Sequence, residues 1–155
     1  MKAIIELSVS KRTIAAWRLL EEFEQRHFAD SALLGACAVF SGKMRNHNDG
    51  KNVASMTLEH YAGMTEKIIE EQIRKTLDKF PVDACLLHHR VGEVLPGDTL
   101  VVCACWSAHR HQAFRACEEI FEGLKSKAPF WKKETLSSGE MQWVTANSKN
   151  PRNPF

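Results

Sequence analysis

The sequence predicts a single α+β domain in which helices pack on a mostly antiparallel sheet. Its 155 residues fit one domain, and a hydrophobic content of 44% is enough to build a core. Segments with helical spacing of apolar residues alternate along the chain with short apolar runs typical of strands. Two turn signals, Leu95-Pro96-Gly97-Asp98 and Ser137-Ser138-Gly139, join neighbouring strand segments directly, which favours antiparallel pairing.

The first third of the chain predicts two strands separated by a helix. Ala3–Val9 has the composition of a short strand. Thr13–Phe28 carries apolar residues at helical spacing and a charged opposite face, so we expect a helix there. Leu33–Phe40 is a continuous apolar run, which is typical of a buried strand, and Ala54–His60 resumes strand character.

A polar connection, SGKMRNHNDGKN, lies between these last two strands and is longer than a tight hairpin needs. It contains an Asp-Gly turn signal and four basic or imidazole side chains, Lys43, Arg45, His47 and Lys51. Long polar loops in compact domains are either mobile or functional. Composition alone slightly favours a solvated, flexible loop, and a functional loop is the alternative.

The next segment predicts a helix followed by two strands. Gly63 to Phe80 has an inward apolar stripe that stops before Pro81, and Thr65 is the expected N-cap. Val82–Val94 and Thr99–Trp106 are two apolar strands joined by the Pro-Gly turn named above.

The last part of the chain predicts a helix and a small hairpin. Ala108–Ser126 has helical spacing, and Trp131–Leu136 and Met141–Thr145 flank a Ser-Ser-Gly turn. We therefore expect one domain over residues 1–145 and a disordered tail over residues 146–155, because the tail is polar and interrupted by proline.

Composition excludes several classes of protein. A net charge of +2 is too close to balance for general nucleic-acid affinity. Five cysteines are an odd number, and four lie in apolar runs, which fits reduced buried thiols better than a disulfide framework. No stretch is long enough to span a membrane, and the N-terminal apolar run is too short for a signal peptide. The expected location is the cytoplasm.

Three groups of side chains resemble functional sites, but a structural role such as packing explains each of them better. Cys103 and Cys105 share a strand face without a second ligand pair, so we expect packing and no metal site. His88 and His89 point to opposite faces of a strand and are interpreted as structural. Trp131 and Trp143 are expected to form a cross-strand pair in the C-terminal hairpin. No glycine-rich phosphate loop is present, so no nucleotide cofactor is expected.

Cations at the start of the last helix suggest an anion site. With Ser107 as N-cap, His109 and Arg110 lie in the first turn, where a positive charge opposes the helix dipole. An anion at the helix N-terminus, bound by backbone N–H groups and Arg110, would offset that cost. Pairing of Arg110 with a nearby carboxylate explains the same residue equally well.

A second cationic cluster follows this helix around Ala128-Pro129-Phe130-Trp131. It comprises Lys125, Lys127, Lys132 and Lys133. Mutual repulsion and partial burial lower the pKa of a lysine, which suits it to proton transfer. A solvated basic surface is the simpler explanation, and we accept it for Lys127 and Lys133.

Five motifs in order resemble the catalytic, large subunit of molybdopterin synthase. They are GKMRNHNDG, TLEHYAGMTEK, HRVGEVLPGD, SAHRHQAF and LKSKAPFWKKE, and the likeness spans about residues 35–144. The resemblance implies an α/β hammerhead-like fold and a sulfurtransferase. That enzyme converts cyclic pyranopterin monophosphate to molybdopterin by inserting two dithiolene sulfurs, with no cofactor of its own. The N-terminal segment, residues 1–34, is longer and more helical than the family leads us to expect.

The resemblance also implies partners and site residues. The sulfur donor is a small ubiquitin-like subunit with a C-terminal Gly-Gly thiocarboxylate, and the enzyme is a heterotetramer built on a large-subunit homodimer. The positions that match the family's functional residues are Arg45, His109 and Arg110 for the substrate, and Lys125 and Lys132 for catalysis. We expect Lys125 to be the principal catalytic group and Lys132 its electrostatic partner.

Helix geometry adds a hypothesis about the dimer. In a continuous helix the Cα atoms of Arg110 and Lys125 are separated by roughly 22 Å, which a pterin-sized molecule barely bridges. We therefore expect His109 and Arg110 to serve the substrate bound beside Lys125 of the other chain.

Two other functions compete with the enzyme. A non-catalytic anion- or RNA-binding module would use the Arg45 loop and the lysine cluster, and would show steeply salt-dependent binding. The near-neutral net charge and the lack of an aromatic stacking platform oppose it. A partner-binding scaffold without activity is opposed by the presence of both Lys125 and Lys132.

Overall fold

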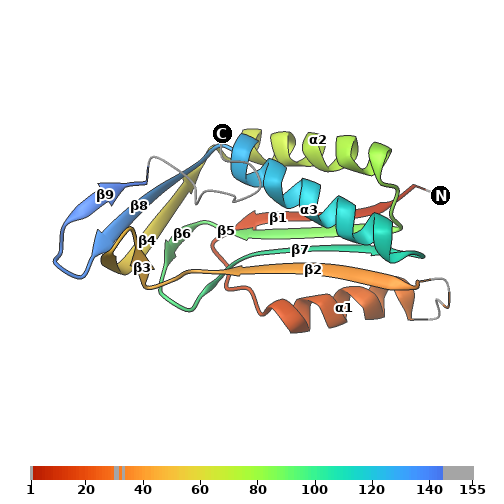
Figure 1. Ribbon diagram of the computed structural model, residues 1–155, viewed down its shortest axis with the longest axis horizontal. Helices are drawn as coiled ribbons and strands as arrows, with labels where there is room; N and C mark the ends of the chain where they lie inside the picture. The colour runs from red at the N-terminus through yellow and green to blue at the C-terminus, as the bar shows by residue number, and fades with distance from the viewer. Residues whose placement is uncertain (1, 30–31, 33, 145–155) are drawn as a thin grey trace.

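The chain folds into two β-sheets, and its helices cover both faces of one of them (Figure 1). The computed structural model describes residues 2–29, 32 and 34–144. The expected disordered tail, residues 146–155, lies outside the described residues. The elements in chain order are β1 (Ile4–Ser10), α1 (Ala16–Phe28), β2 (Ala36–Lys43), β3 (His47–Asn48), β4 (Lys51–His60), α2 (Met64–Lys79), β5 (Ala84–Arg90), β6 (Gly92–Val94), β7 (Thr99–Ser107), α3 (Arg110–Lys127), β8 (Phe130–Leu136) and β9 (Met141–Trp143).

The first sheet has the strand order β1-β5-β7-β2. Only its β1–β5 pair is parallel; β5–β7 and β7–β2 are antiparallel. Figure 1 shows α2 and α3 on one face of this sheet and α1 on the other. Both faces of β5 and β7 are therefore buried, which explains why their sequences are continuous apolar runs and not alternating patterns. The predicted α+β class with mostly antiparallel pairing is confirmed.

The second sheet is formed by β3, β4, β8 and β9, with β6 paired to β4. In Figure 1 it extends from one end of the first sheet. Its own apolar cluster includes Met56, Leu58, Val94 and Leu136. The β8–β9 pair is the C-terminal hairpin that the sequence predicts. The two sheets meet where the chain passes from β2 to β3 and from β5 to β6.

The expected strand Val82–Val94 is divided between the two sheets. β5 ends at Arg90, and Gly92 has a φ of 78°, a left-handed conformation that glycine adopts without a steric penalty. The chain therefore changes direction, and β6 pairs with β4. The apolar pattern continues through this bend because both sheets bury their residues, so periodicity does not show the break.

The polar connection after β2 is not a long loop. β2 continues to Lys43, and β3 and β4 are joined by a two-residue turn at Asp49 and Gly50, with φ values of 47° and 78°. Two positive φ values are the signature of the hairpin turn that an Asp-Gly pair favours. The prediction of a flexible loop was wrong because the turn signal decided the local structure more strongly than the polar composition.

The two residues expected as helix N-caps, Thr65 and Ser107, do not occupy the N-cap positions of the observed helices. α2 has Gly63 at its N-cap position, and the Gly63 N–H donates to Glu66 Oε2 over 2.6 Å. Thr65 lies inside the helix. β7 continues through Ser107, which pairs with β2, so α3 has His109 at its N-cap position and begins at Arg110. Strand pairing overrides the capping preference of Ser107.

The C-terminal hairpin forms, but its tryptophans are not opposite each other. Lys133 is the register partner of Trp143, and its Nζ lies 5.5 Å from the Trp143 ring centroid. The Trp131 ring contacts Tyr61 instead, with centroids 5.5 Å apart. The predicted cross-strand pair was wrong because the hairpin register is shifted by two residues from the one we assumed.

The cysteines are reduced, as the sequence predicts, but Cys37 is exposed because its strand, β2, lies at the edge of the first sheet. All five are free thiols, and Cys85, Cys103, Cys105 and Cys117 are buried. They fill space between the first sheet and α3 as small apolar side chains.

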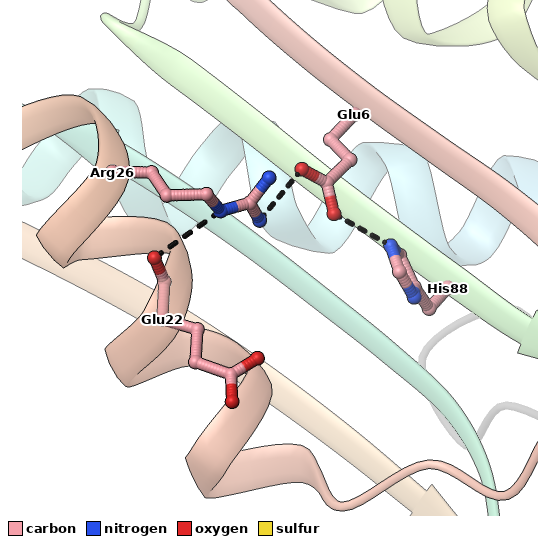
Figure 2. A network of polar contacts seen from close by, with 4 residues as sticks. All are labelled: Glu6, Glu22, Arg26 and His88. Carbon is pink, nitrogen blue, oxygen red and sulfur yellow. Dashed lines mark hydrogen bonds and ion pairs between the residues drawn. The ribbon is translucent and has the colours of Figure 1, made fainter.

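A polar network attaches α1 to the first sheet (Figure 2). Glu6 on β1 accepts a hydrogen bond from Arg26 over 3.0 Å and contacts His88 Nε2 over 2.9 Å. Arg26 also donates to the Glu22 carbonyl oxygen within α1. His88 therefore faces α1 and has a structural role, as expected.

Within the described residues, no helix is long and apolar enough to cross a membrane.

Alanine substitutions at two glycines can test the packing of this fold. A Cβ on Gly35 would lie 2.2 Å from the backbone oxygen of Ala108, and a backbone atom yields only if the chain moves. We expect Gly35→Ala to lower the free energy of unfolding by about 1–3 kcal/mol. Urea denaturation measures this loss.

Gly123→Ala is the matched control, because its Cβ would meet the end of the flexible Gln72 side chain at 2.7 Å. The better helix propensity of alanine, about 0.5–1 kcal/mol, offsets that contact. We expect a much smaller effect than at Gly35, and equal losses at both positions would contradict the packing described here.

Candidate active site

A cavity of about 430 Å³ lies where the two sheets meet the C-terminal end of α3. Its walls come from the segment joining β2 to β3, from β4, β5 and β8, and from the last turns of α3. This volume is in the range of small-molecule binding sites. The lining combines apolar side chains with polar groups that are far apart in the sequence.

Three of the five predicted site residues line this cavity. Arg45 follows β2, Lys125 lies in the last turn of α3, and Lys132 lies on β8. The fold thus brings Arg45 to two lysines that are 80 or more positions later in the chain. Lys43 also lines the cavity, so four basic side chains surround it, a composition suited to an anion.

The two lysines differ in their surroundings. The Lys125 Nζ lies 5.1 Å from the ring centroid of Phe121, one helical turn earlier, so a cation–π contact orients it. Burial and the charge of Lys125 lower the pKa of Lys132, while Glu134 opposes that shift. The proton of Lys132 is therefore easier to transfer than that of an exposed lysine.

A buried carboxylate, Glu134, also lines the cavity. It accepts hydrogen bonds from Asn48 Nδ2 over 2.9 Å and from Gln142 Nε2 over 3.0 Å. These two amides link β3, β8 and β9 and fix the carboxylate beside Lys132. Burial lowers the pKa of Lys132 most, the charge of Lys125 adds to that shift, and this carboxylate opposes it.

His89 is part of the cavity wall and is buried. Its Nδ1 lies 2.7 Å from the Arg90 carbonyl oxygen, and its ring stacks on Phe130 with centroids 4.2 Å apart and planes 13° apart. Burial lowers the pKa of His89 to about 4, the charges of Lys132 and His60 add to the shift, and the bond to Arg90 opposes it. The imidazole is neutral at pH 7.

The other two predicted residues, His109 and Arg110, lie at the opposite end of α3. They line a separate hollow of about 510 Å³ with Gly35, Ala108, His111 and Phe114. α3 is continuous from Arg110 to Lys127, so the helical rise places Arg110 roughly 22 Å from Lys125. In the described part of the chain, no carboxylate forms an ion pair with Arg110. One chain therefore contains two separate groups of cations.

Known proteins resemble this chain in sequence and in architecture. A sequence model described as the MoaE protein matches residues 14–127, well over half of the chain. The chain belongs to the MoaE family. It is 46% identical over 116 residues to a molybdopterin synthase catalytic subunit of Salmonella typhimurium, a match that covers 75% of this chain and 77% of the relative.

Solved structures share this fold over most of the chain. A molybdopterin biosynthesis MoaE protein from Burkholderia ambifaria superposes with a TM-score of 0.75 at 35% identity, over 97% of this chain and 95% of that one. A complex of subunits 1 and 2 of the molybdopterin-converting factor from Helicobacter pylori matches with a TM-score of 0.73 at 23% identity, over 94% and 93%. The 97% coverage includes α1, so the helical N-terminal segment is within the fold shared with the Burkholderia protein.

Two cavity residues, His89 and Glu134, were not singled out from the sequence as site residues. A signal for Glu134 was present, because residues two apart on a strand share a face and Lys132 is two positions earlier. His89 was interpreted as structural together with His88. Strand alternation correctly predicts that the two histidines lie on opposite faces, but only the tertiary structure shows that one of those faces lines the cavity.

No group of three His, Cys, Asp or Glu side chains suited to a metal ion occurs among residues 2–29, 32 and 34–144.

The buried neutral state of His89 predicts a pH dependence of stability. Between about pH 6.5 and 4, the unfolded chain binds a proton at this residue and the folded chain does not. Above pH 6.5 the histidine is neutral in both states and does not lower the free energy of unfolding. As the pH falls through that window, the free energy of unfolding decreases by up to about 3 kcal/mol. We expect His89→Phe to lose less free energy of unfolding than the wild type between pH 7.5 and pH 4.5, as measured by urea denaturation. Equal losses in both proteins would contradict the buried neutral state.

Proposed function

We propose that this chain is the catalytic subunit of a molybdopterin synthase, which inserts two dithiolene sulfurs into cyclic pyranopterin monophosphate. The observation that supports this most directly is the cavity lined by Arg45, Lys125 and Lys132 in a member of the MoaE family. The Salmonella relative is named a molybdopterin synthase catalytic subunit. The cavity provides cations for a phosphate and apolar walls for a flat ring system.

The proposed roles follow from position and charge. Arg45 offers a planar guanidinium that binds phosphate oxygens in a bidentate manner. Lys125, held on Phe121, is the principal catalytic group and stabilises the negative charge that develops during sulfur transfer. Lys132 is its electrostatic partner, and its lowered pKa suits it to donate a proton to a leaving oxygen. Opening of the cyclic phosphate and release of the spent carboxylate both need such groups.

The sulfur donor in this proposal is a small ubiquitin-like subunit with a C-terminal Gly-Gly thiocarboxylate. The Helicobacter complex joins two subunits of the molybdopterin-converting factor, one of which shares this fold. A Gly-Gly end is narrow enough to enter a cavity as an extended peptide. Because the partner supplies the sulfur, the catalytic chain needs no cofactor or metal of its own, and we place the reaction in the cytoplasm.

We further propose that the active site is shared across a homodimer within a heterotetramer. The cations of one chain fall into two groups at opposite ends of α3, in separate hollows. A dimer that brings the His109–Arg110 end of one chain to the Lys125 end of the other would complete each site. This arrangement uses both groups on one substrate, which the length of α3 prevents within a chain.

The catalytic role of Lys125 can be tested with thiocarboxylated small subunit and the cyclic pterin phosphate. We expect Lys125→Ala to lower the rate of dithiolene formation at least about 100-fold, because it removes the group that stabilises the developing negative charge. The matched control is Lys127→Ala, two residues away, whose Nζ contacts Gln72 on α2. A folded Lys125→Ala protein with normal turnover would refute this assignment.

Mixed dimers test the shared site. Lys125→Ala and Arg110→Ala chains, each impaired alone, are expected to regain activity after subunit exchange, because one of the two sites in a mixed dimer is intact. Recovery should approach half of the wild-type rate per mixed dimer. If exchange is confirmed by mass spectrometry and no activity returns, both groups act within one chain.

A further inference from the structure

The cations of the cavity account for only part of a pterin phosphate. A phosphate is bound by donors, and Arg45, Lys125 and Lys132 are donors. A pterin ring also presents N–H groups, which need acceptors when they are buried, because an unpaired buried donor costs about 1–3 kcal/mol. The cavity must therefore offer acceptors as well as cations.

His89 has one acceptor atom available, and its hydrogen bonding determines which. The Arg90 carbonyl oxygen can only accept, so Nδ1, 2.7 Å away, must carry the proton. In a neutral ring the lone pair is then on Nε2. Since Nδ1 is engaged with the backbone, Nε2 is the only polar atom that the ring can offer to a molecule in the cavity.

The ring is also held rigidly. Stacking on Phe130 at 4.2 Å fixes its plane, and position 89 lies on β5, a central strand of the first sheet. The groups that face it are Lys132 on β8 and His60 on β4, and both disfavour a second proton on the imidazole. A positively charged ring would be a donor at both nitrogens, whereas the neutral ring retains its acceptor.

We propose that His89 is a specificity residue that binds the pterin ring of the substrate by accepting a hydrogen bond from a ring N–H or amino group at Nε2. This proposal rests on the function proposed above and extends it by dividing the cavity into two parts. Arg45, Lys125 and Lys132 bind the phosphate, and His89, with its stacked partner Phe130, binds the heterocycle.

The alternative is that His89 only packs against Phe130. The two explanations differ in what a phenylalanine would do, because phenylalanine retains the stacking and lacks the acceptor. They also differ in selectivity, since the loss of an acceptor weakens binding of the pterin but not of a simple anion. Glutamine at the same position supplies an amide oxygen and restores an acceptor.

The experiment measures binding and turnover in wild type, His89→Phe, His89→Gln and the control His88→Phe. His88 is the adjacent residue of the same type; it faces α1 (Figure 2) and does not line the cavity. Binding of cyclic pyranopterin monophosphate to the homodimer is measured by calorimetry, and inorganic phosphate is tested as a competitor. Turnover is measured with thiocarboxylated small subunit, so that KM and kcat are separated.

We expect His89→Phe to raise Kd and KM for the pterin about 10- to 100-fold, with a smaller change in kcat. The competition constant of inorganic phosphate should be unchanged. His89→Gln should recover most of the pterin affinity, and His88→Phe should behave as wild type. If His89→Phe does not fold, the glutamine variant and a His89→Leu variant provide the same comparison.

Three results would overturn the proposal. The first is wild-type pterin affinity in His89→Phe, and the second is an equal loss of phosphate and pterin affinity, which indicates collapse of the cavity. In both cases, normal turnover by the wild type leaves the proposed function intact. The third is failure of the wild type to bind the pterin or form product, which refutes the proposed function together with the role of His89.

Discussion

Crowding of positive charge in one cavity is the constraint on which the rest of the site depends. Partial burial disfavours the charge on Lys132, and the charge of Lys125 adds to that effect. The protein opposes this repulsion with fixed partners: the Phe121 ring under Lys125 and the Glu134 carboxylate beside Lys132. An anion such as a phosphate, bound in this cavity, would favour the charged form of Lys132 because it opposes both the burial and the repulsion.

The junction of the two sheets provides the cavity that holds these charges. Gly92 turns the chain from β5 into β6, and the Asp49-Gly50 turn folds β3 back on β4. Asn48, on β3, then reaches Glu134 on β8. The backbone conformation at these few residues thus determines which distant side chains share one wall. α3 acts as a fixed spacer that separates the two groups of cations.

Several features followed directly from the sequence because they depend on neighbouring residues. The helices, the strand segments, the buried thiols and the opposite orientation of His88 and His89 all reflect local periodicity. The flexible loop was wrongly predicted because a local turn signal outweighed polar composition, but two other errors occurred where a long-range contact overrode a local preference. Ser107 pairs in β7 and so does not cap α3, and the hairpin register places Lys133, not Trp131, opposite Trp143.

By itself, the sequence determined the fold class, the family resemblance and the types of residue that bind an anion. The continuity of α3 was also predictable, and with it the separation of Arg110 from Lys125. Only the tertiary structure decided that Arg45 and the two lysines share a cavity and that His89 and Glu134 complete its wall. The physical reason is that strand pairing across the two sheets fixes these distances, and that pairing is set by contacts between residues far apart in the chain.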